Sequence, residues 1–245
     1  MLKVEGVSKS YRGNGWLGGE RRQVLRRIHM EWNKGESLGI IGESGSGKST
    51  LGRLLLGIEK PDEGRVTWGG RPVTDRRARR GTISAVFQDY TSSIHPFYTV
   101  RQALLEPLKL IGGQWDARKL AELLRQVGLD ESYLDKYPHE LSGGEAQRVC
   151  IARAVSSNPQ CMLLDEAISS LDGSVQMQVL ELLKGLKDTY GMGYIFITHD
   201  IMAAAYLCDR IMIVQSGEIV ETVETEQLGH VETDYAKALL RKVIV

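Results

Sequence analysis

The apolar positions of the chain follow two kinds of pattern, which predict strands alternating with helices. Short, nearly continuous apolar runs are typical of buried strands. They occupy residues 37–41, 82–87, 161–164 and 194–198. Longer stretches place apolar residues three and four positions apart, as amphipathic helices do. These occupy residues 100–110, 116–127 and 175–186. This alternation predicts an α/β fold with a mostly parallel sheet.

The two ends of the chain predict smaller antiparallel elements. Residues 2–11 and 23–32 alternate loosely, and a turn at residues 61–64 precedes a short strand at 65–68. We expect an N-terminal antiparallel β-subdomain from these segments, with a glycine-rich loop at residues 13–19. Near the C-terminus, Ser216-Gly217 predicts a two-residue hairpin between strands at 210–214 and 218–222, and residues 232–241 predict a last helix.

The middle of the chain changes character between about residues 91 and 158. Asp116 is placed to cap a helix that Gly128 ends, and a further helix is expected over residues 145–157. We therefore expect an inserted α-helical subdomain within one domain that covers residues 1–245.

Composition and charge narrow the possible functions. The 245 residues can bury a substantial core, and 31 basic side chains balance 31 acidic ones, so no global field favours nucleic acid. The start of the chain lacks the apolar run of a signal peptide, and no run approaches the about 18 apolar residues of a membrane span. Cys150, Cys161 and Cys208 lie in apolar segments, which predicts buried thiols in a reducing compartment.

Residues 42–50 read G-E-S-G-S-G-K-S-T and match the phosphate-loop pattern between a predicted strand and helix. The backbone of such a loop wraps phosphate oxygens, and the following helix adds its positive end. Lys48 would reach the β- and γ-phosphates, and the Ser49 hydroxyl would ligate Mg²⁺. The alternative is a glycine-rich turn without a ligand. The predicted nucleotide-binding residues of this loop are Gly42, Ser44, Gly45, Ser46, Gly47, Lys48, Ser49 and Thr50.

Further polar side chains stand where buried strands end. Asp165 and Glu166 follow residues 161–164; Asp165 would hold Mg²⁺ through water, and Glu166 would act as general base. Read alone, this pair could instead cap a helix. Gln88 and His199 end two other strands, where each can reach a γ-phosphate, its metal or the attacking water. A lone histidine at a strand end is more often structural.

A serine and two glycines precede the helix expected from residue 145. The stretch is Leu141, Ser142, Gly143, Gly144 and Glu145. By itself it reads as a plain helix N-cap, but it would also be a second anion-binding helix terminus. Two phosphate grips in one domain, one in the core and one in the helical insert, are not expected to meet within one molecule. Two such domains packed head to tail would bring each grip onto the other's nucleotide.

The order of these motifs resembles that of ATP-binding-cassette (ABC) nucleotide-binding subunits over essentially the whole chain. The resemblance implies that Tyr11 stacks on adenine, that Gln88 links Mg²⁺ to a transmembrane partner, and that His199 orients the γ-phosphate and water. It also implies that residues 141–145 grip the opposing subunit's nucleotide. The dimer-interface loop would be Ser170, Leu171 and Asp172.

Two positions depart from the common family pattern. Glu145 stands where many members have Gln, and Ala167-Ile168 replace a Pro-Thr pair. An acid in a first helical turn is tolerated, and the second change leaves Asp165 and Glu166 in place. We expect both catalytic functions to be intact.

The sequence of residues 165–172, D-E-A-I-S-S-L-D, resembles that of the nickel and metallophore branch of the oligopeptide/dipeptide/nickel importers. The resemblance implies an ATPase using ATP and Mg²⁺ on the cytoplasmic face of the cell membrane. It also implies a second ATP-binding subunit, expected to be a different paralogue, two permeases and, indirectly, an extracytoplasmic solute-binding protein, with no nucleic acid. The alternatives are a peptide importer or other ABC transporter, and a soluble ABC ATPase that remodels nucleic acid.

Overall fold

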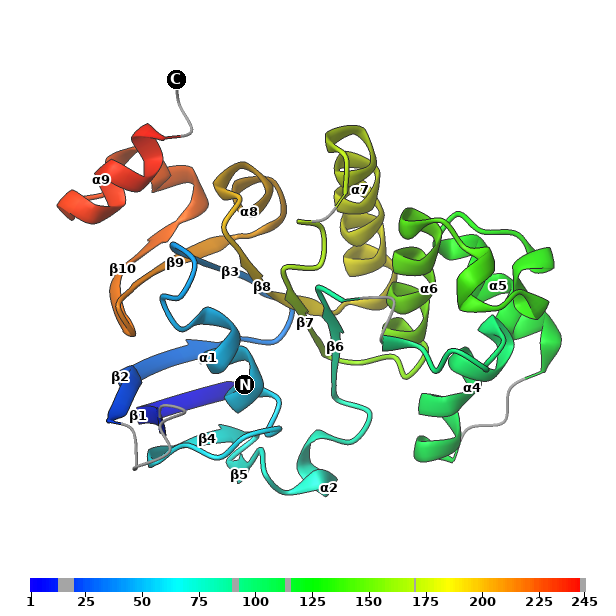
Figure 1. Cartoon of the computed structure of the whole chain (residues 1–245), viewed down its shortest axis with the longest axis horizontal. Helices are drawn as coiled ribbons and strands as arrows, with labels where there is room; N and C mark the ends of the chain where they lie inside the picture. The colour runs from blue at the N-terminus through cyan, green and yellow to red at the C-terminus, as the bar shows by residue number, and fades with distance from the viewer. Residues whose placement is uncertain (13–19, 90–92, 113–115, 170, 243–245) are drawn as a thin grey trace. The chain divides into compact units, whose positions relative to one another are not determined.

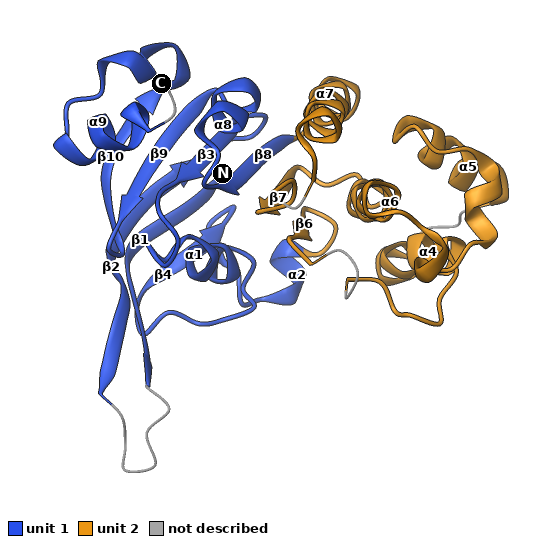
Figure 2. Cartoon of the chain, turned by 45° about the horizontal axis from the view of Figure 1, so that its top comes forward, with its two compact units in different colours: residues 1–79, 193–245 blue, residues 80–192 orange. Residues whose placement is uncertain are grey.

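The computed structural model describes residues 1–12, 20–89, 93–112, 116–169 and 171–242 (Figure 1). The glycine-rich loop expected at residues 13–19 lies outside this part of the chain. Two compact units are formed, one by residues 1–79 with 193–245 and the other by residues 80–192 (Figure 2). The predicted limits of a helical insert at residues 91–158, within a single domain, stay a prediction.

The first unit begins with the expected antiparallel sheet, in the order β2-β1-β4-β5. Its strands are β1 (Leu2–Arg12), β2 (Arg21–Trp32), β4 (Glu63–Trp68) and β5 (Arg71–Pro72). Along β1 the buried Leu2 and Val4 alternate with the half-buried Lys3 and Glu5, as expected for a sheet that buries one face. The predicted N-terminal β-subdomain is confirmed, with strands slightly longer than the pattern indicated.

The second sheet of this unit has β3 (Ser37–Ile41) between β8 (Gly193–Thr198) and β9 (Arg210–Gln215), all parallel. β10 (Glu218–Glu224) joins β9 in antiparallel sense. Every residue of β3 and β8 is buried, which explains their continuous apolar runs. The unit's helical elements are α1 (Lys48–Leu55), α2 (Arg76–Arg79), α8 (Ile201–Leu207), the 3₁₀ helix η3 (Thr225–His230) and α9 (Asp234–Arg241).

Trp32 joins the two sheets of the first unit. Its fully buried indole stacks on Trp68 of β4 with ring centroids 5.5 Å apart. The indole N–H donates to the carbonyls of Glu36 and Tyr194, at 2.8 and 3.1 Å. One side chain of β2 thus contacts β4, the turn before β3, and β8. It fixes the antiparallel sheet against the strand that leads to the phosphate loop.

The second unit holds two parallel strands and most of the helices. The strands are β6 (Ile83–Phe87) and β7 (Cys161–Asp165). The helices are α4 (Val100–Ile111), α5 (Ala117–Gln126), η1 (Glu131–Asp135), η2 (Pro138–Glu140), α6 (Gly143–Val155) and α7 (Gly173–Tyr190). Asp116 caps α5 by accepting from the Lys119 N–H at 2.9 Å, as predicted. The expected α/β fold, with a mostly parallel sheet, is confirmed.

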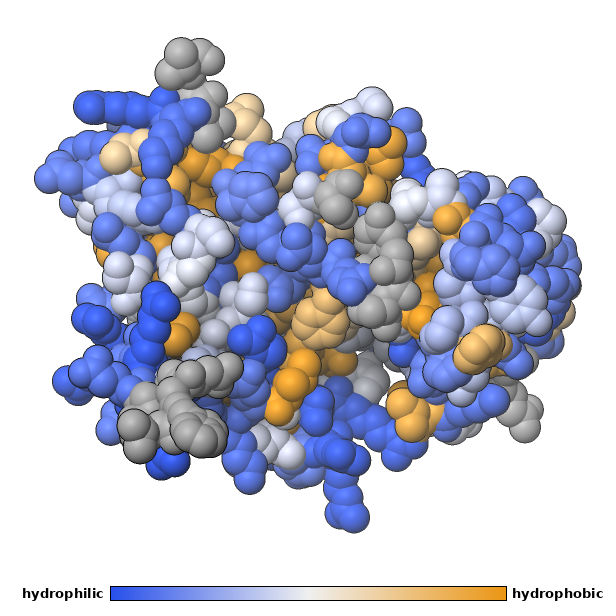
Figure 3. Space-filling model, in the orientation of Figure 1, coloured by the Kyte–Doolittle hydropathy of each residue, from blue (hydrophilic) through white to orange (hydrophobic). Residues whose placement is uncertain are grey.

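The three cysteines are buried, as the sequence predicted. Burial raises the pKa of Cys150 to about 12. Hydrophilic residues predominate on the face drawn in Figure 3. Arg79, one of four arginines within residues 76–80, is half-buried and donates to the Leu56 carbonyl at 2.9 Å. A guanidinium at the C-terminal end of α1 complements the helix dipole there.

Within the described residues, no helix is both long and apolar enough to cross a membrane.

The hairpin between β9 and β10 braces the first unit. Ser216 and Gly217 adopt φ angles of 48° and 83°, as a type I′ turn requires. The Gly217 N–H donates to the Ser46 carbonyl at 3.0 Å, and its carbonyl accepts from the Arg26 N–H at 2.8 Å. A Cβ on Gly217 would lie 2.2 Å from the Val24 carbonyl oxygen. Glycine is therefore required here both by the backbone conformation and by the close approach of β2.

Gly217→Ala should lower the free energy of unfolding by about 2–4 kcal/mol, because it combines a strained φ with a backbone clash. Urea denaturation of the purified chain would measure this loss. Gly185→Ala is the matched control: Gly185 is exposed in α7 with nothing within 4 Å of an added Cβ. That change should raise stability by up to about 1 kcal/mol. Equal effects of the two substitutions would contradict the bracing role of Gly217.

Candidate nucleotide-binding site

The predicted phosphate loop connects β3 to α1, as the sequence indicated. Gly42 follows the last residue of β3 with a φ of 155°. A Cβ there would lie 2.2 Å from the Val214 carbonyl oxygen on β9, so no larger residue fits. Ser44 and Gly45 are exposed, whereas Ser46 and Gly47 are buried. The loop therefore packs its two ends into the sheet and leaves its middle accessible.

Lys48 is the first residue of α1, and its side chain turns back into the loop. The residue is 6% exposed, and its ammonium group donates to the carbonyls of Gly42 and Glu43 at 2.7 and 3.0 Å. The Ser46 N–H donates to the Glu43 carbonyl at 3.2 Å and tightens the same turn. The first N–H groups of a helix have no partner within it. A buried cation at the N-terminus of α1 thus forms an anion-binding arrangement.

Three contacts that sequence reasoning missed hold this loop from outside. The Glu43 N–H donates to the Tyr235 hydroxyl of α9 at 3.2 Å. The Lys242 ammonium pairs with the Glu43 carboxylate at 2.7 Å and, mainly through that hydrogen bond, lowers the pKa of Glu43. Gly217 supplies the third contact, described above. No sequence motif predicts these contacts, because the partner residues lie about 170 to 200 positions from the loop.

Strand pairing brings His199 to the same edge as the phosphate loop. β3 and β8 pair in parallel with Ile41 opposite Thr198, so Gly42 and His199 follow at neighbouring strand ends. His199 is exposed, and the buried Thr198 accepts a hydrogen bond from the Asp200 N–H at 3.0 Å. Tyr11, near the end of β1, is half-buried and donates its hydroxyl hydrogen to Glu59. The catalytic role of His199 and the stacking role of Tyr11 stay predictions.

The second unit places Gln88, Asp165 and Glu166 together by the same rule. β6 and β7 pair in parallel with Phe87 opposite Asp165, so Gln88 and Glu166 both follow at that edge. Asp165 is 8% exposed, whereas Gln88 is exposed. Glu166 adopts a φ of 51°, unusual for a residue other than glycine and typical of strained functional positions. Its carbonyl accepts from the N–H and hydroxyl of Ser169, at 3.2 and 2.9 Å, which holds the turn.

Ala167 and Ile168, which replace the common Pro-Thr pair, are buried and anchored by two glutamines. The Gln147 amide, fully buried on α6, donates to the Ala167 carbonyl. The Gln176 amide of α7 donates to the Ile168 carbonyl at 3.0 Å. These bonds fix the segment after Glu166 without a proline. Gln147 was not singled out from sequence, although it lies only two positions beyond Glu145.

The predicted dimer-interface loop is described in part. Leu171 donates its N–H to the Ile168 carbonyl at 3.2 Å, and the exposed Asp172 is the N-cap residue of α7. Ser170 lies outside the described residues.

The stretch at residues 141–145 opens α6 with a reciprocal cap. The Ser142 hydroxyl accepts from the Glu145 N–H at 3.4 Å, and the Glu145 carboxylate accepts from the Ser142 N–H at 2.7 Å. The Tyr133 hydroxyl also donates to Glu145. This bond, with those from Ser142, lowers the pKa of Glu145 to about 2. Its charge is thus directed into protein hydrogen bonds, while Ser142 is exposed and Gly143 and Gly144 are half-buried.

The residues suggested for Mg²⁺ suit a hard cation. Hydroxyl, amide and carboxylate oxygens are the ligands that Mg²⁺ prefers, and it keeps several waters of its own. Ser49 of α1, Gln88 after β6 and Asp165 of β7 supply those groups. Among the described residues, no cluster of three His, Cys, Asp or Glu side chains could hold a metal without a further ligand. Each unit, taken by itself, therefore carries oxygen donors of the kind that Mg²⁺ prefers.

Comparison with known proteins agrees with this arrangement. The family described as "ABC transporter" matches residues 25–169. The metal-staphylopine import system ATP-binding protein CntF of Staphylococcus aureus is 49% identical, over 99% of this chain and 98% of that protein. The nickel import ATP-binding protein NikE of Rhodospirillum rubrum is 40% identical over 100% and 91%, and that of Escherichia coli is 39% identical over 100% and 94%.

Solved structures show the same fold. The dimeric ATP-binding cassette MJ0796, bound to ADP and Pi, superposes with a TM-score of 0.81 at 31% identity, covering 92% of this chain and 99% of that one. CbiO1 from Clostridium perfringens, part of an ABC transporter complex, gives 0.77 at 27% identity, over 99% and 93%. With a phosphate loop, an acid pair after a buried strand and a capped glycine pair all in the family order, the chain belongs to the ABC transporter family.

Proposed function

We propose that the chain is the ATP-hydrolysing subunit of a bacterial ABC importer that drives uptake of nickel or a metal–metallophore complex. The phosphate loop carries the proposal: its lysine is buried among loop carbonyls at the start of α1. The cargo rests on similarity to import proteins for nickel and metal-staphylopine over nearly their full length. That similarity favours this branch over a peptide importer or a nucleic-acid-remodelling ATPase.

The proposed reaction transfers the γ-phosphoryl group of ATP to water. Lys48 and the N–H groups of the loop hold the phosphates, and Tyr11 receives the adenine. Glu166 accepts a proton from water as the water oxygen bonds to phosphorus and the bond to the ADP oxygen breaks. His199 orients the water and the γ-phosphate. Ser49, Gln88 and, through water, Asp165 would hold Mg²⁺, which would supply positive charge to the phosphates when bound.

The N-terminus of α6 would complete the site of a second subunit. Ser142 is exposed, and the N–H groups of Gly143 and Gly144 begin the helix, beside the Glu145 N–H that the Ser142 hydroxyl caps. The Glu145 carboxylate at this helix end is already engaged by hydrogen bonds from Ser142 and Tyr133. ATP would then hold two ATPase subunits together, with Leu171 and Asp172 at their interface, and hydrolysis would release them.

The remaining partners would be two permeases at the cytoplasmic face of the membrane and, indirectly, an extracytoplasmic binding protein. The segment after Gln88 offers a surface for a permease. Phe97 is 81% exposed, and His95 packs against both Phe97 and Tyr98, with centroids 5.8 and 4.6 Å apart. Exposed aromatic side chains grouped in this way are typical of protein interfaces.

Glu166→Gln should lower ATP turnover at least about 100-fold, because the amide cannot accept the proton from water. It should also trap an ATP-bound dimer, measured by light scattering with the partner ATPase subunit and Mg²⁺ present. Glu122→Gln, an exposed change on α5, is the control and should leave turnover unaltered. Wild-type turnover in Glu166→Gln would refute its assignment as the base.

Lys48→Met retains an apolar stem but removes the ammonium group, so ATP binding should weaken about 100-fold or more. Titration with a fluorescent ATP analogue would measure the affinity, and circular dichroism would confirm that the loop change leaves the fold intact. Lys34→Met, in the exposed turn before β3, should bind ATP normally. Unchanged affinity in the Lys48 variant would exclude it from the phosphate grip.

The cargo can be tested in cells that lack the chromosomal copy of this gene. Uptake of radioactive nickel, supplied free or with an opine-type metallophore, should return with the wild-type chain and not with Glu166→Gln. Restored uptake of a labelled oligopeptide, with no restored metal uptake, would instead identify a peptide importer.

A further inference from the structure

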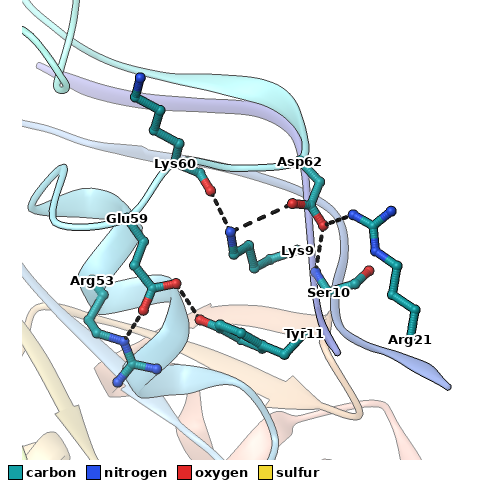
Figure 4. A network of polar contacts seen from close by, with 8 residues as sticks. All are labelled: Lys9, Ser10, Tyr11, Arg21, Arg53, Glu59, Lys60 and Asp62. Carbon is teal, nitrogen blue, oxygen red and sulfur yellow. Dashed lines mark hydrogen bonds and ion pairs between the residues drawn. The ribbon is translucent and has the colours of Figure 1, made fainter. Parts of the chain in front are cut away.

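Tyr11 is held at its hydroxyl by a carboxylate outside the motifs described so far. Glu59, in the segment after α1, accepts the Tyr11 hydroxyl hydrogen on one oxygen. Its other oxygen accepts from the Arg53 Nε at 2.7 Å (Figure 4). The Glu59 side chain is only 24% exposed, which shields both contacts from water. Burial acts to raise the pKa of Glu59, but the hydrogen bonds from Tyr11 and Arg53 outweigh it and lower the pKa.

The same chain of contacts continues to the phosphate-loop helix. Arg53 lies on α1, and its Nη2 donates to the Thr50 hydroxyl at 3.2 Å. Thr50 is the last residue of the phosphate-loop motif and is buried. Tyr11, Glu59, Arg53 and Thr50 therefore form one line of hydrogen bonds from β1 to the helix that follows the phosphate loop.

A second anchor acts on the ring of Tyr11. Lys9 stands two positions earlier on β1, on the same side of the strand, with its ammonium 5.5 Å from the ring centroid. That ammonium donates to the Lys60 carbonyl at 2.7 Å and lies 3.6 Å from the Asp62 carboxylate (Figure 4). Asp62 also accepts from the Ser10 N–H and from Arg21, at 2.8 and 2.6 Å. The segment 59–62 thus contacts the Tyr11 hydroxyl directly, through Glu59. It also holds Lys9, through Lys60 and Asp62, over one face of the Tyr11 ring.

We propose that Glu59 is a positioning residue for the nucleotide base: it fixes the Tyr11 ring in the orientation that stacks on adenine and ties that ring to the phosphate-loop helix. This inference rests on the proposed stacking role of Tyr11. A ring held at its hydroxyl loses less rotamer freedom when the base arrives, so more of the stacking energy becomes affinity. With Lys9 over one face, the base uses the opposite face.

The test separates the base from the phosphates. Isothermal titration of the full chain with Mg²⁺ would compare ATP with inorganic tripolyphosphate, which lacks a base. Glu59→Ala should weaken ATP about 5–10-fold and leave tripolyphosphate unchanged. Tyr11→Phe, which keeps the ring and loses the hydroxyl, should reproduce this selective loss. In a Tyr11→Ala background, Glu59→Ala should have no further effect on ATP, because no ring remains to be positioned.

Glu5→Ala is the matched control. Glu5 lies on β1, as Tyr11 does, and like Glu59 it pairs with an arginine, here Arg65 at 2.6 Å. This substitution should alter neither affinity. Two results would overturn the role of Glu59 and leave that of Tyr11 standing. One is an equal loss of affinity for ATP and tripolyphosphate in Glu59→Ala. The other is an unchanged ATP affinity in Glu59→Ala when Tyr11→Ala weakens ATP binding. An unchanged ATP affinity in Tyr11→Ala would overturn the stacking role on which the inference rests.

Discussion

The site depends on a fixed backbone conformation of the loop between Ile41 and Lys48. The loop needs accessible N–H groups in its middle, yet its ends must be fixed, because backbone donors stabilise an anion only when their positions are set in advance. The ends are fixed by the pairing of β3 with β9, by the Gly217 N–H on the Ser46 carbonyl, and by the contacts of Tyr235 and Lys242 with Glu43. Segments from three parts of the first unit thus converge on one short loop.

In the second unit, helix α6 contributes to two parts of the proposed site. α6 begins with the glycine pair, and its Gln147 reaches the segment immediately after Glu166. One rigid helix therefore connects the group proposed to grip a partner's nucleotide with the turn that carries the proposed base. Because Gln147 is fully buried and bonded to the Ala167 carbonyl, a shift of α6 would displace that turn.

Much of this arrangement could be predicted from sequence, because it follows from local rules. Buried strands, a glycine-rich loop and polar residues at strand ends are visible in the order of residues, and parallel register then places Gln88 beside Glu166 and His199 beside Gly42. Glu145 was expected to be tolerated through the helix dipole. The structure adds a stronger reason, its reciprocal bond with Ser142 and the bond from Tyr133.

Long-range partners could not be predicted. Glu59, Tyr235 and Gln147 act through contacts with residues 20 to 192 positions away, and such pairs leave no periodic signal. The left-handed backbone of Glu166 likewise depends on the Ser169 contacts and has no signature in composition. Sequence therefore indicates which groups are candidates for the chemistry, whereas the tertiary structure shows what holds them in place.

The central claim is that one nucleotide is held by the phosphate loop of one subunit and by residues 142–144 of another. Photocleavage by vanadate trapped with ADP and Mg²⁺ tests this most directly, because it cuts the backbone beside the trapped γ-phosphate mimic. The account predicts cuts both within residues 42–50 and at Ser142. Cuts confined to residues 42–50, in an assembly shown to be dimeric, would contradict it.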